Sequence, residues 1–230
     1  MAVAQFLVLL GPSSLKDRQV LELGCGTGLP SLAAACCGAN VVASDISPVA
    51  LSLMREGWIE TTTPTKRRPF LNKDDDDSSK TTGTLTTLAF DLFSSLPLPL
   101  VMEKEGGCSS TNARTAPPIV IAAAMMYEAD LAQGLAGRLM EACSLGAWVI
   151  LGDDDTGERD GGRAFFMAEF ARLEDELLLS SSSRNDSSLS KVKRVWTDVT
   201  VKNAELGWRE KQVRLLHLNP PPGILSESNA

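Results

Sequence analysis

Two acids and three closely spaced glycines near the start of the chain have the types and spacing of a nucleoside-binding site. Glu22 comes just before Gly24, Gly26 and Gly28, and Asp45 lies 21 residues after Gly24. In a strand-helix-strand unit, an acid at this distance can reach the ribose of a bound nucleotide. A carboxylate accepts hydrogen bonds from both ribose hydroxyls, so the spacing favours a ribose without a 2′-phosphate.

The spacing of the glycines distinguishes two kinds of nucleoside. Dinucleotide-binding turns have the pattern G-x-G-x-x-G, whereas this turn is Gly-Cys-Gly-Thr-Gly. A pyrophosphate requires a wide nest of backbone amides, while a sulfonium ligand with an amino-acid tail requires acceptors, which Glu22 and the turn carbonyls can supply. A nicotinamide-dependent oxidoreductase stays an alternative, but the spacing and the absence of a Tyr-x-x-x-Lys pair disfavour it.

The residues around the turn have the pattern of a βαβ unit. A short apolar run at 20–23 suits a buried parallel strand, and a second such run ends at Asp45. Between them a helix is expected over 29–37, with Pro30 in its first turn, where helices tolerate proline. The helix N-terminus and both strand tips then face one crevice, where open α/β sheets bind their ligands.

The segment from Glu22 to Gly28, Glu-Leu-Gly-Cys-Gly-Thr-Gly, resembles motif I of the class I S-adenosylmethionine-dependent methyltransferases, and Asp45 resembles their ribose-binding acid. The longer segment 20–51 is similar to the seven-strand protein lysine methyltransferases, in the group that includes the nicotinamide N-methyltransferase-like proteins and the electron-transfer flavoprotein beta-subunit lysine methyltransferase. The resemblance implies an α/β fold with a doubly wound, Rossmann-like seven-stranded sheet, mostly parallel with one antiparallel edge strand.

The same resemblance implies an activity. The chain is expected to be an N-methyltransferase that uses S-adenosylmethionine as cofactor and acts on a protein lysine or a small amine by in-line methyl transfer. Such a reaction depends mainly on alignment, which can contribute about 7 to 11 kcal/mol. The residues expected to hold the cofactor are Glu22, Gly24, Cys25, Gly26, Gly28, Asp45, Ile46, Phe90, Asp91 and Ala123.

The tip of the expected strand 119–124 forms the substrate side of the crevice. Members of the resembled group usually have Asp-x-x-Tyr here, whereas this chain has Ala-Met-Met-Tyr at 124–127. The resemblance assigns Tyr127 and Glu128 to the substrate side, although Tyr127 fits a capping aromatic equally well, and the catalytic residue stays unknown. Because Ala124 replaces the acid, a second interpretation stays open: a methyltransferase-fold binding module that is catalytically weakened or inactive.

The whole chain, 1–230, is expected to form a single methyltransferase-like domain. Low-complexity insertions interrupt it near 61–84, 103–118 and 180–192, and a flexible tail begins at 219. The other elements expected from the periodicity are helices at 48–60, 129–143 and 162–179, strands at 84–90, 119–124 and 147–151, and a closing hairpin of strands at 194–201 and 212–218.

Composition and charge exclude some classes of partner. The net charge of -7 disfavours a broad nucleic-acid surface, which needs clustered Lys and Arg. No apolar run approaches the roughly 20 residues of a membrane span. The apolar segment 2–10 has no Lys or Arg before it and is interrupted by Gln5, so a helix covering the first strand is favoured over a signal peptide.

The cysteines and the single histidine indicate structural roles. The five cysteines include no CxxC pair, which favours a reducing intracellular compartment such as the cytoplasm, with the nucleus and the mitochondrion as alternatives. Because His217 is the one histidine, a zinc site of His and Cys is disfavoured and no metal is expected. His217 is expected on an edge strand, where a histidine is more often structural than catalytic.

Overall fold

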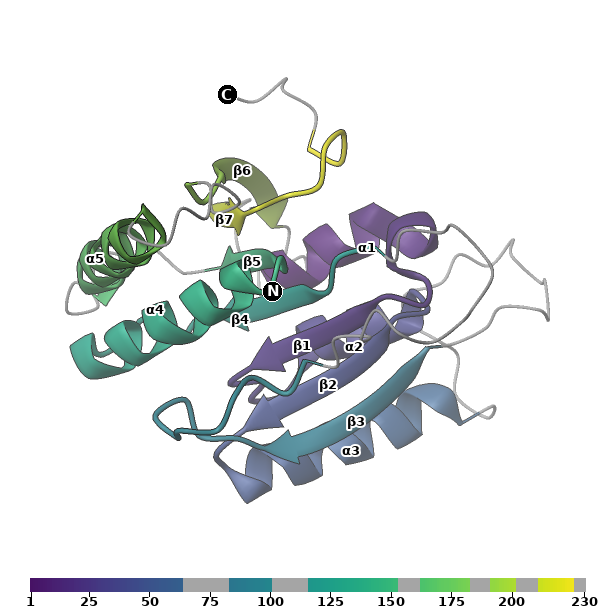
Figure 1. Cartoon of the computed structure of the whole chain (residues 1–230). Coiled ribbons are helices and arrows are strands. Elements are labelled where there is room, and N and C mark those ends of the chain that lie inside the picture. Colours follow the sequence, from purple (N-terminus) through teal and green to yellow (C-terminus); the bar gives the residue numbers. More distant parts are fainter. Residues whose placement is uncertain (64–82, 101–115, 153–161, 183–190, 202–210, 226–230) are drawn as a thin grey trace, which may run out of the picture.

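The computed structural model describes residues 1–63, 83–100, 116–152, 162–182, 191–201 and 211–225 (Figure 1). Most of the three predicted insertions lie outside these residues. The helices are α1 Ala2–Leu15, α2 Leu29–Cys36, α3 Pro48–Thr62, α4 Ala129–Ser144 and α5 Gly162–Ser182. The strands are β1 Gln19–Leu23, β2 Asn40–Asp45, β3 Thr84–Ala89, β4 Ile119–Ala123, β5 Trp148–Gly152, β6 Arg194–Val201 and β7 Lys211–Leu218. The elements expected from the periodicity are present, with ends shifted by a few residues.

The described strands form a seven-stranded sheet in the order β3-β2-β1-β4-β5-β7-β6. Strands β1 to β5 pair in parallel, while β7 pairs antiparallel with both β5 and β6. The antiparallel strand thus belongs to the hairpin at the edge, in which β6 is outermost. This is the Rossmann-like, mostly parallel sheet that the sequence predicts. Its strand order reverses between β1 and β4, and open α/β sheets bind ligands at such a reversal.

Each face of the sheet has its own apolar cluster, because successive residues of a strand point to opposite faces. On one face Leu21 and Leu23 of β1 pack with α4 and α5, and on the other Val20 packs with α1 and α2. Figure 1 shows α4 and α5 in front of the sheet and α3 behind it. The central strands are therefore covered on both faces, which explains why they are apolar runs with little alternation.

The starts of α2 and α3 follow from local sequence. Gly28 precedes α2 with a φ of +68°, a left-handed conformation that glycine adopts without strain, and Pro30 lies in the first turn. The Ser47 hydroxyl caps α3 by accepting a hydrogen bond from the Ala50 amide at 3.3 Å. Because α2 follows the turn after β1 and α3 follows β2, both helix N-termini lie at the carboxyl edge of the sheet.

Helix α1 covers a different part of the sheet from the one expected. Its main neighbours are α2 and the strands β5, β6 and β7, although Val20 of β1 shares its apolar cluster. The ring of His217 is fully buried beneath it, 4.9 Å from the ring of Phe6 between centroids. This burial is consistent with the structural role expected for His217, but its strand β7 lies between β5 and β6 and is not the outermost strand.

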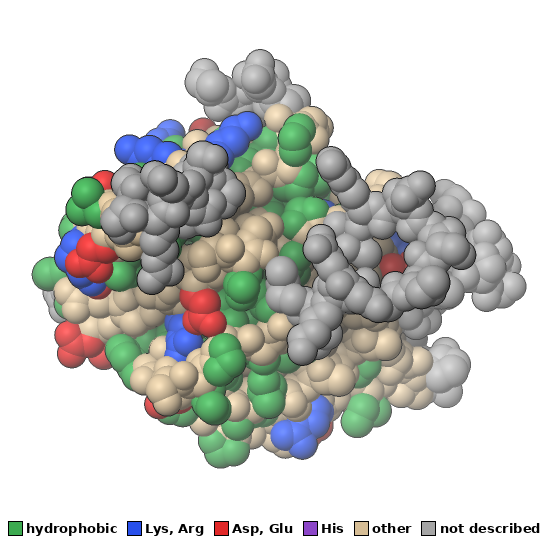
Figure 2. Space-filling view, viewed as in Figure 1, with side chains coloured by type: hydrophobic (Ala, Val, Ile, Leu, Met, Phe, Trp, Pro, Cys, Tyr) green, Lys and Arg blue, Asp and Glu red, His purple; other side chains and the backbone are tan. Residues whose placement is uncertain are grey.

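Within the described residues, no helix combines the length and apolarity needed to cross a bilayer. Figure 2 shows hydrophobic, charged and other side chains intermixed on this face, with acidic and basic side chains gathered at the end where α4 and α5 lie in Figure 1.

Candidate functional site

The tips of the central strands meet at the point of strand reversal. Leu23, the last residue of β1, is level with Ser44 of β2 and with Ala122 of β4. The glycine turn that follows β1 therefore emerges between the ends of these two strands. On the other side of β2, the Phe90 amide donates to the Asp45 carbonyl at 3.1 Å. The sheet thus places the turn and the two predicted acidic tips on one edge.

Asp45 holds the glycine turn against the tip of β2. Its Oδ2 atom accepts a hydrogen bond from the Gly26 amide at 2.9 Å, and its Oδ1 atom accepts one from the Ser47 amide at 2.8 Å. The side chain is half-buried, and each carboxylate oxygen can accept more than one hydrogen bond. Asp45 therefore keeps acceptor capacity for a ligand, and the adjacent Ile46 is 70% exposed.

Gly26 leaves one side of the turn open. Its φ of +51° is a left-handed conformation, which strains residues that have a Cβ. Nothing lies within 4 Å of the position that a Cβ on Gly26 would occupy. A ligand could therefore approach the backbone here more closely than at a residue with a side chain.

Methionine side chains occupy the space beside the other two glycines. A Cβ on Gly24 would lie 2.1 Å from Sδ of Met125, and a Cβ on Gly28 would lie 1.7 Å from Sδ of Met54. Met54 is fully buried in a small apolar cluster, so its contact is core packing. Met125 is half-buried just after β4. Part of the space beside the turn is thus taken by the protein's own side chain.

Glu22 lies beneath the start of α2. Its carboxylate is 1% exposed and accepts hydrogen bonds from the Ser31 hydroxyl and, at 3.0 Å, from the Ser31 amide. Burial raises the pKa of Glu22 to about 7, although the hydrogen bonds from Ser31 act in the opposite direction. The sequence predicts that Glu22 supplies acceptors to the ligand, but the alternation along β1 turns its carboxylate toward α2, where Ser31 binds it. Glu22 fixes the helix to the strand that bears the turn.

Cys25 contributes its backbone to the turn. Its amide donates to the Ser44 carbonyl at 2.8 Å, and its carbonyl accepts from the Gly28 amide at 2.7 Å. Burial raises the pKa of the Cys25 thiol to about 12, so the nucleophilic thiolate is scarce at neutral pH. Within the described ranges, no group of three or more His, Cys, Asp and Glu residues could hold a metal ion.

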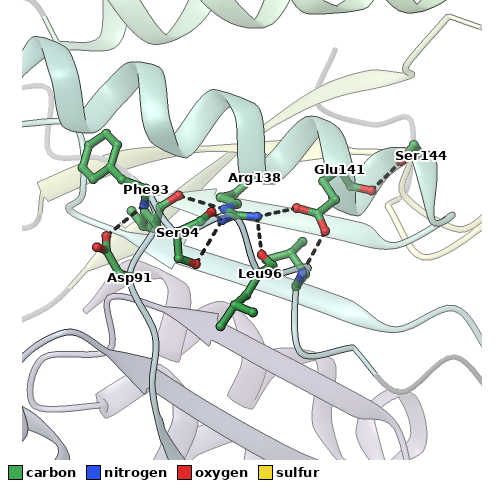
Figure 3. A network of polar contacts seen from close by, with 9 residues as sticks. Asp91, Phe93, Ser94, Leu96, Arg138, Glu141 and Ser144 are labelled. Carbon is green, nitrogen blue, oxygen red and sulfur yellow. Dashed lines mark hydrogen bonds and ion pairs between the residues drawn. The ribbon is translucent and has the colours of Figure 1, made fainter.

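Arg138 of α4 fastens the loop that follows β3 (Figure 3). It donates to the carbonyl oxygens of Leu92 at 2.8 Å and Leu96 at 2.9 Å, and also to that of Ser94. Its ion pair with Glu141 measures 2.8 Å. The sequence does not predict these contacts of Arg138, because hydrogen bonds from a helix to backbone carbonyls more than 40 residues away have no sequence motif.

Phe90 and Asp91 begin this loop. The Phe90 ring is 8% exposed and lies 5.2 Å from the Arg138 guanidinium carbon, so it belongs to the core. Asp91 is half-buried, and its Oδ1 atom accepts from the Phe93 amide at 2.9 Å. Both residues are close in the fold to Asp45, while their contact with a cofactor stays a prediction.

The end of β4 presents the other predicted residues. Ala123 is half-buried, and Ala124 after it is exposed with a φ of +55°. Left-handed backbone strains alanine, whereas Asp and Asn adopt it more readily. The backbone at 124 would therefore suit an Asp or Asn better than the Ala that is present. Tyr127 and Glu128 are exposed and line a hollow beside α4.

Comparisons with known proteins agree with the architecture. No protein-family model matches the sequence, and no curated protein matches it. Among solved structures, a TehB-like SAM-dependent methyltransferase from Corynebacterium glutamicum has a TM-score of 0.50 at 11% identity, covering 94% of this chain and 86% of that one. An N-methyltransferase from Bradyrhizobium japonicum has a TM-score of 0.47 at 12% identity, covering 94% and 92%. At 11% identity the likeness to the Corynebacterium structure concerns the fold alone, which is a Rossmann-like methyltransferase fold.

Proposed function

We propose that the chain is an S-adenosylmethionine-dependent N-methyltransferase that acts on a protein lysine or a small amine. The observation that carries the proposal is the 2.9 Å hydrogen bond between the Gly26 amide and the Asp45 carboxylate. It joins a turn with open backbone to an acid suited to ribose hydroxyls, at the strand reversal where such sheets bind ligands. The methyltransferase fold supports the same conclusion.

The turn suits this cofactor better than a dinucleotide. The Gly26 and Gly28 amides are already engaged, by Asp45 and by the Cys25 carbonyl, so they do not form a nest for a pyrophosphate. In the proposed complex the Asp45 carboxylate accepts hydrogen bonds from the ribose hydroxyls, and the backbone from Gly24 to Gly26 lies along the ligand. Glu22 acts indirectly, by fixing α2 beneath the turn.

Few catalytic side chains are needed for such a reaction. When bound, S-adenosylmethionine supplies a methyl carbon attached to a positively charged sulfur. The chain must align the acceptor with that carbon and receive the acceptor as an uncharged amine, since an ammonium has no lone pair. Apolar surroundings such as Met125 favour the uncharged amine by lowering its pKa.

The proposal is tested by calorimetric titration with S-adenosylmethionine and S-adenosylhomocysteine. We expect binding of both, and a loss of about tenfold or more in affinity in Asp45→Ala, because hydrogen bonds to a charged group are strong. Asp175→Ala, at an exposed position of α5, is the matched control and should bind like the wild type. Absence of binding, or equal affinity in both variants, would refute the proposal.

The exposed, left-handed Ala124 favours a second candidate, a methyltransferase-fold module that binds the cofactor without transferring its methyl group. Tritiated S-adenosylmethionine mixed with a proteome distinguishes the two, since only an active enzyme labels an acceptor. If the wild type binds but does not label, Ala124→Asp tests whether the missing acid is the cause.

A further inference from the structure

A hollow of 710 Å³ lies beside the carboxyl end of β4. Three segments far apart in the sequence bound it: the loop after β3, the start of α4, and α5. Its lining includes Phe93, Tyr127, Glu128, Asp130, Leu131 and Glu169. Since three residues of chain span at most about 11 Å, Tyr127 lies within that distance of Ala124 at the strand tip. The hollow therefore adjoins the edge at which methyl transfer is proposed.

Phe93 forms a wall that is exposed yet firmly supported. Its side chain is 62% exposed, and its ring rests on α4 where a Cβ at Gly134 would come within 2.7 Å of it. One helical turn further, Arg138 binds the carbonyl oxygens of Leu92 and Ser94 on either side of Phe93 (Figure 3). The fold thus presents a large aromatic ring to solvent in a fixed place.

Two carboxylates on the same hollow lack partners. In the described part of the chain, the side chains of Glu128 and Asp130 have no hydrogen bond or ion pair. Glu169 differs, because Arg172 pairs with it at 2.6 Å. Tyr127, which is 46% exposed, adds a second aromatic ring. Aromatic faces attract cations. The rings of Phe93 and Tyr127 and the two unpaired carboxylates therefore form a surface suited to a cation with an apolar stem.

We propose that this hollow binds the side chain of a lysine in a basic protein segment. The four-carbon stem of lysine lies against Phe93 and Tyr127, and its ammonium meets Glu128 and Asp130. The inference rests on the proposed function for the methyl transfer that follows, but not for the binding itself. Recognition of the charged form takes place outside the strand tip, so the nitrogen loses its proton to bulk water after this contact and before methyl transfer.

The openness of the hollow favours a protein over a free amine. Sites for small molecules enclose most of the ligand surface, whereas most of the side chains that line this hollow, including both rings and both unpaired carboxylates, are exposed. A lysine that belongs to a larger partner gains further contacts outside the hollow. The net charge of -7 also attracts a basic partner over a longer range.

The test is fluorescence anisotropy of a labelled peptide of alternating Lys and Gly residues with the full chain, without cofactor. We expect binding that is lost when the lysines are acetylated. The double variant Glu128→Gln/Asp130→Asn should bind about fivefold or more weakly, and Phe93→Ala should also bind more weakly. The matched control Glu56→Gln/Asp175→Asn removes the same charge from exposed positions of α3 and α5 and should stay within about twofold of the wild type.

Either of two results would overturn the inference. An equal loss in both double variants would mean general attraction to the negative charge of the protein. Binding of n-butylamine as tight as that of the peptide would exclude the protein segment as the specific occupant. Thermal unfolding is followed for each variant, because Asp130 lies in the first turn of α4, where an acid stabilises a helix. If the double variant does not fold, Glu128→Gln alone is compared with Glu56→Gln.

Titration with S-adenosylhomocysteine separates this inference from the proposed function. If the chain binds S-adenosylhomocysteine but the peptide does not depend on the hollow, the inference fails and the proposed function stands. If the peptide depends on the hollow and S-adenosylhomocysteine does not bind, the proposed function fails and the lysine site stands.

Discussion

Both hydrogen-bond donors of Ser31, its amide and its hydroxyl, bind the same oxygen of Glu22, although the two residues are nine positions apart. The Ser31 amide belongs to the first turn of α2, where amides have no partner within the helix. Glu22 therefore caps α2 from the strand beneath it. The contact ties the helix and the strand on either side of the glycine turn into one unit.

Glu22→Gln should raise stability at neutral pH more than at acidic pH. In the folded chain the pKa of Glu22 is about 7 instead of 4.5, because burial disfavours the charge. The folded state therefore holds the Glu22 proton more tightly than the unfolded state does. This proton contributes fully to the free energy of unfolding below pH 4.5, and the contribution is lost as the pH rises through 7. The loss is at most about 3 kcal/mol. Denaturant unfolding of wild type and variant across this range measures it.

The glutamine variant keeps the contact while removing the titration. Its amide oxygen can still accept both hydrogen bonds from Ser31. Glu56→Gln, exposed on α3, is the matched control and should retain the pH dependence of the wild type. A variant that is less stable than the wild type above pH 7 would contradict the prediction.

His217 should show the opposite pH dependence. Burial lowers its pKa from 6.5 to about 4, and its Nε2 atom lies 2.7 Å from the Thr197 hydroxyl oxygen. The unfolded state then binds the His217 proton more tightly than the folded state does. The neutral, buried ring therefore contributes fully to the free energy of unfolding above pH 6.5. This contribution, about 3 kcal/mol at most, is lost as the pH falls through 4. His217→Phe removes this titration, so its free energy of unfolding relative to the wild type should rise by up to about 3 kcal/mol as the pH falls from 6.5 to 4. Denaturant unfolding followed by circular dichroism at each pH measures this difference.

These two dependences act in opposite directions over nearly the same range of pH. In the wild type they offset one another, so its stability should change little between pH 4.5 and 6.5. Glu22→Gln should then expose the histidine effect, and His217→Phe should expose the glutamate effect. If the unfolding free energies of Glu22→Gln and His217→Phe changed in the same direction between pH 4.5 and 6.5, these opposing roles of the two residues would be wrong.

Met125→Ala should strengthen cofactor binding. The Met125 sulfur lies against Gly24, so its removal vacates space beside the turn, and calorimetry should show a several-fold gain in affinity for S-adenosylhomocysteine. Met54→Ala is the control, because Met54 packs on Gly28 in the same way but is fully buried. It should lose about 2 to 5 kcal/mol of stability without a gain in affinity. Weaker binding in Met125→Ala would show that this side chain is a wall of the site.

Arg138→Lys should loosen the loop after β3. Lysine keeps the charge but cannot reproduce the fork that binds the Leu92 and Leu96 carbonyl oxygens together. We expect a loss of about 2 kcal/mol in unfolding free energy and faster hydrogen exchange over 92–98. Arg172→Lys is the control, since its pairs with Glu169 and Glu176 are exposed and contribute little. If hydrogen exchange over 92–98 is unchanged in Arg138→Lys, the proposal that Arg138 holds this loop in place is wrong.

Much of the fold could be predicted because the relevant signals are local. The apolar runs, the position of Pro30 and the Ser47 cap each act within a few residues, and they locate the helices and strands well. The spacing of Gly24 and Asp45 also placed the acid at the turn, because a βαβ unit of that length brings one strand tip beside the next. The low-complexity insertions lie mostly outside the described residues, so their structure stays a prediction.

By itself, the sequence determined the order of the elements and the acid beside the glycine turn, since both depend on short-range backbone geometry and on the pairing of adjacent strands. Only the tertiary structure decided that Glu22 faces α2, that Met125 lies over Gly24, and that Phe93 and the carboxylates around Tyr127 share one hollow. These relationships depend on which face of a strand a helix covers and on how α4 and α5 pack across the sheet. Such packing joins residues far apart in the chain, and no local pattern records it.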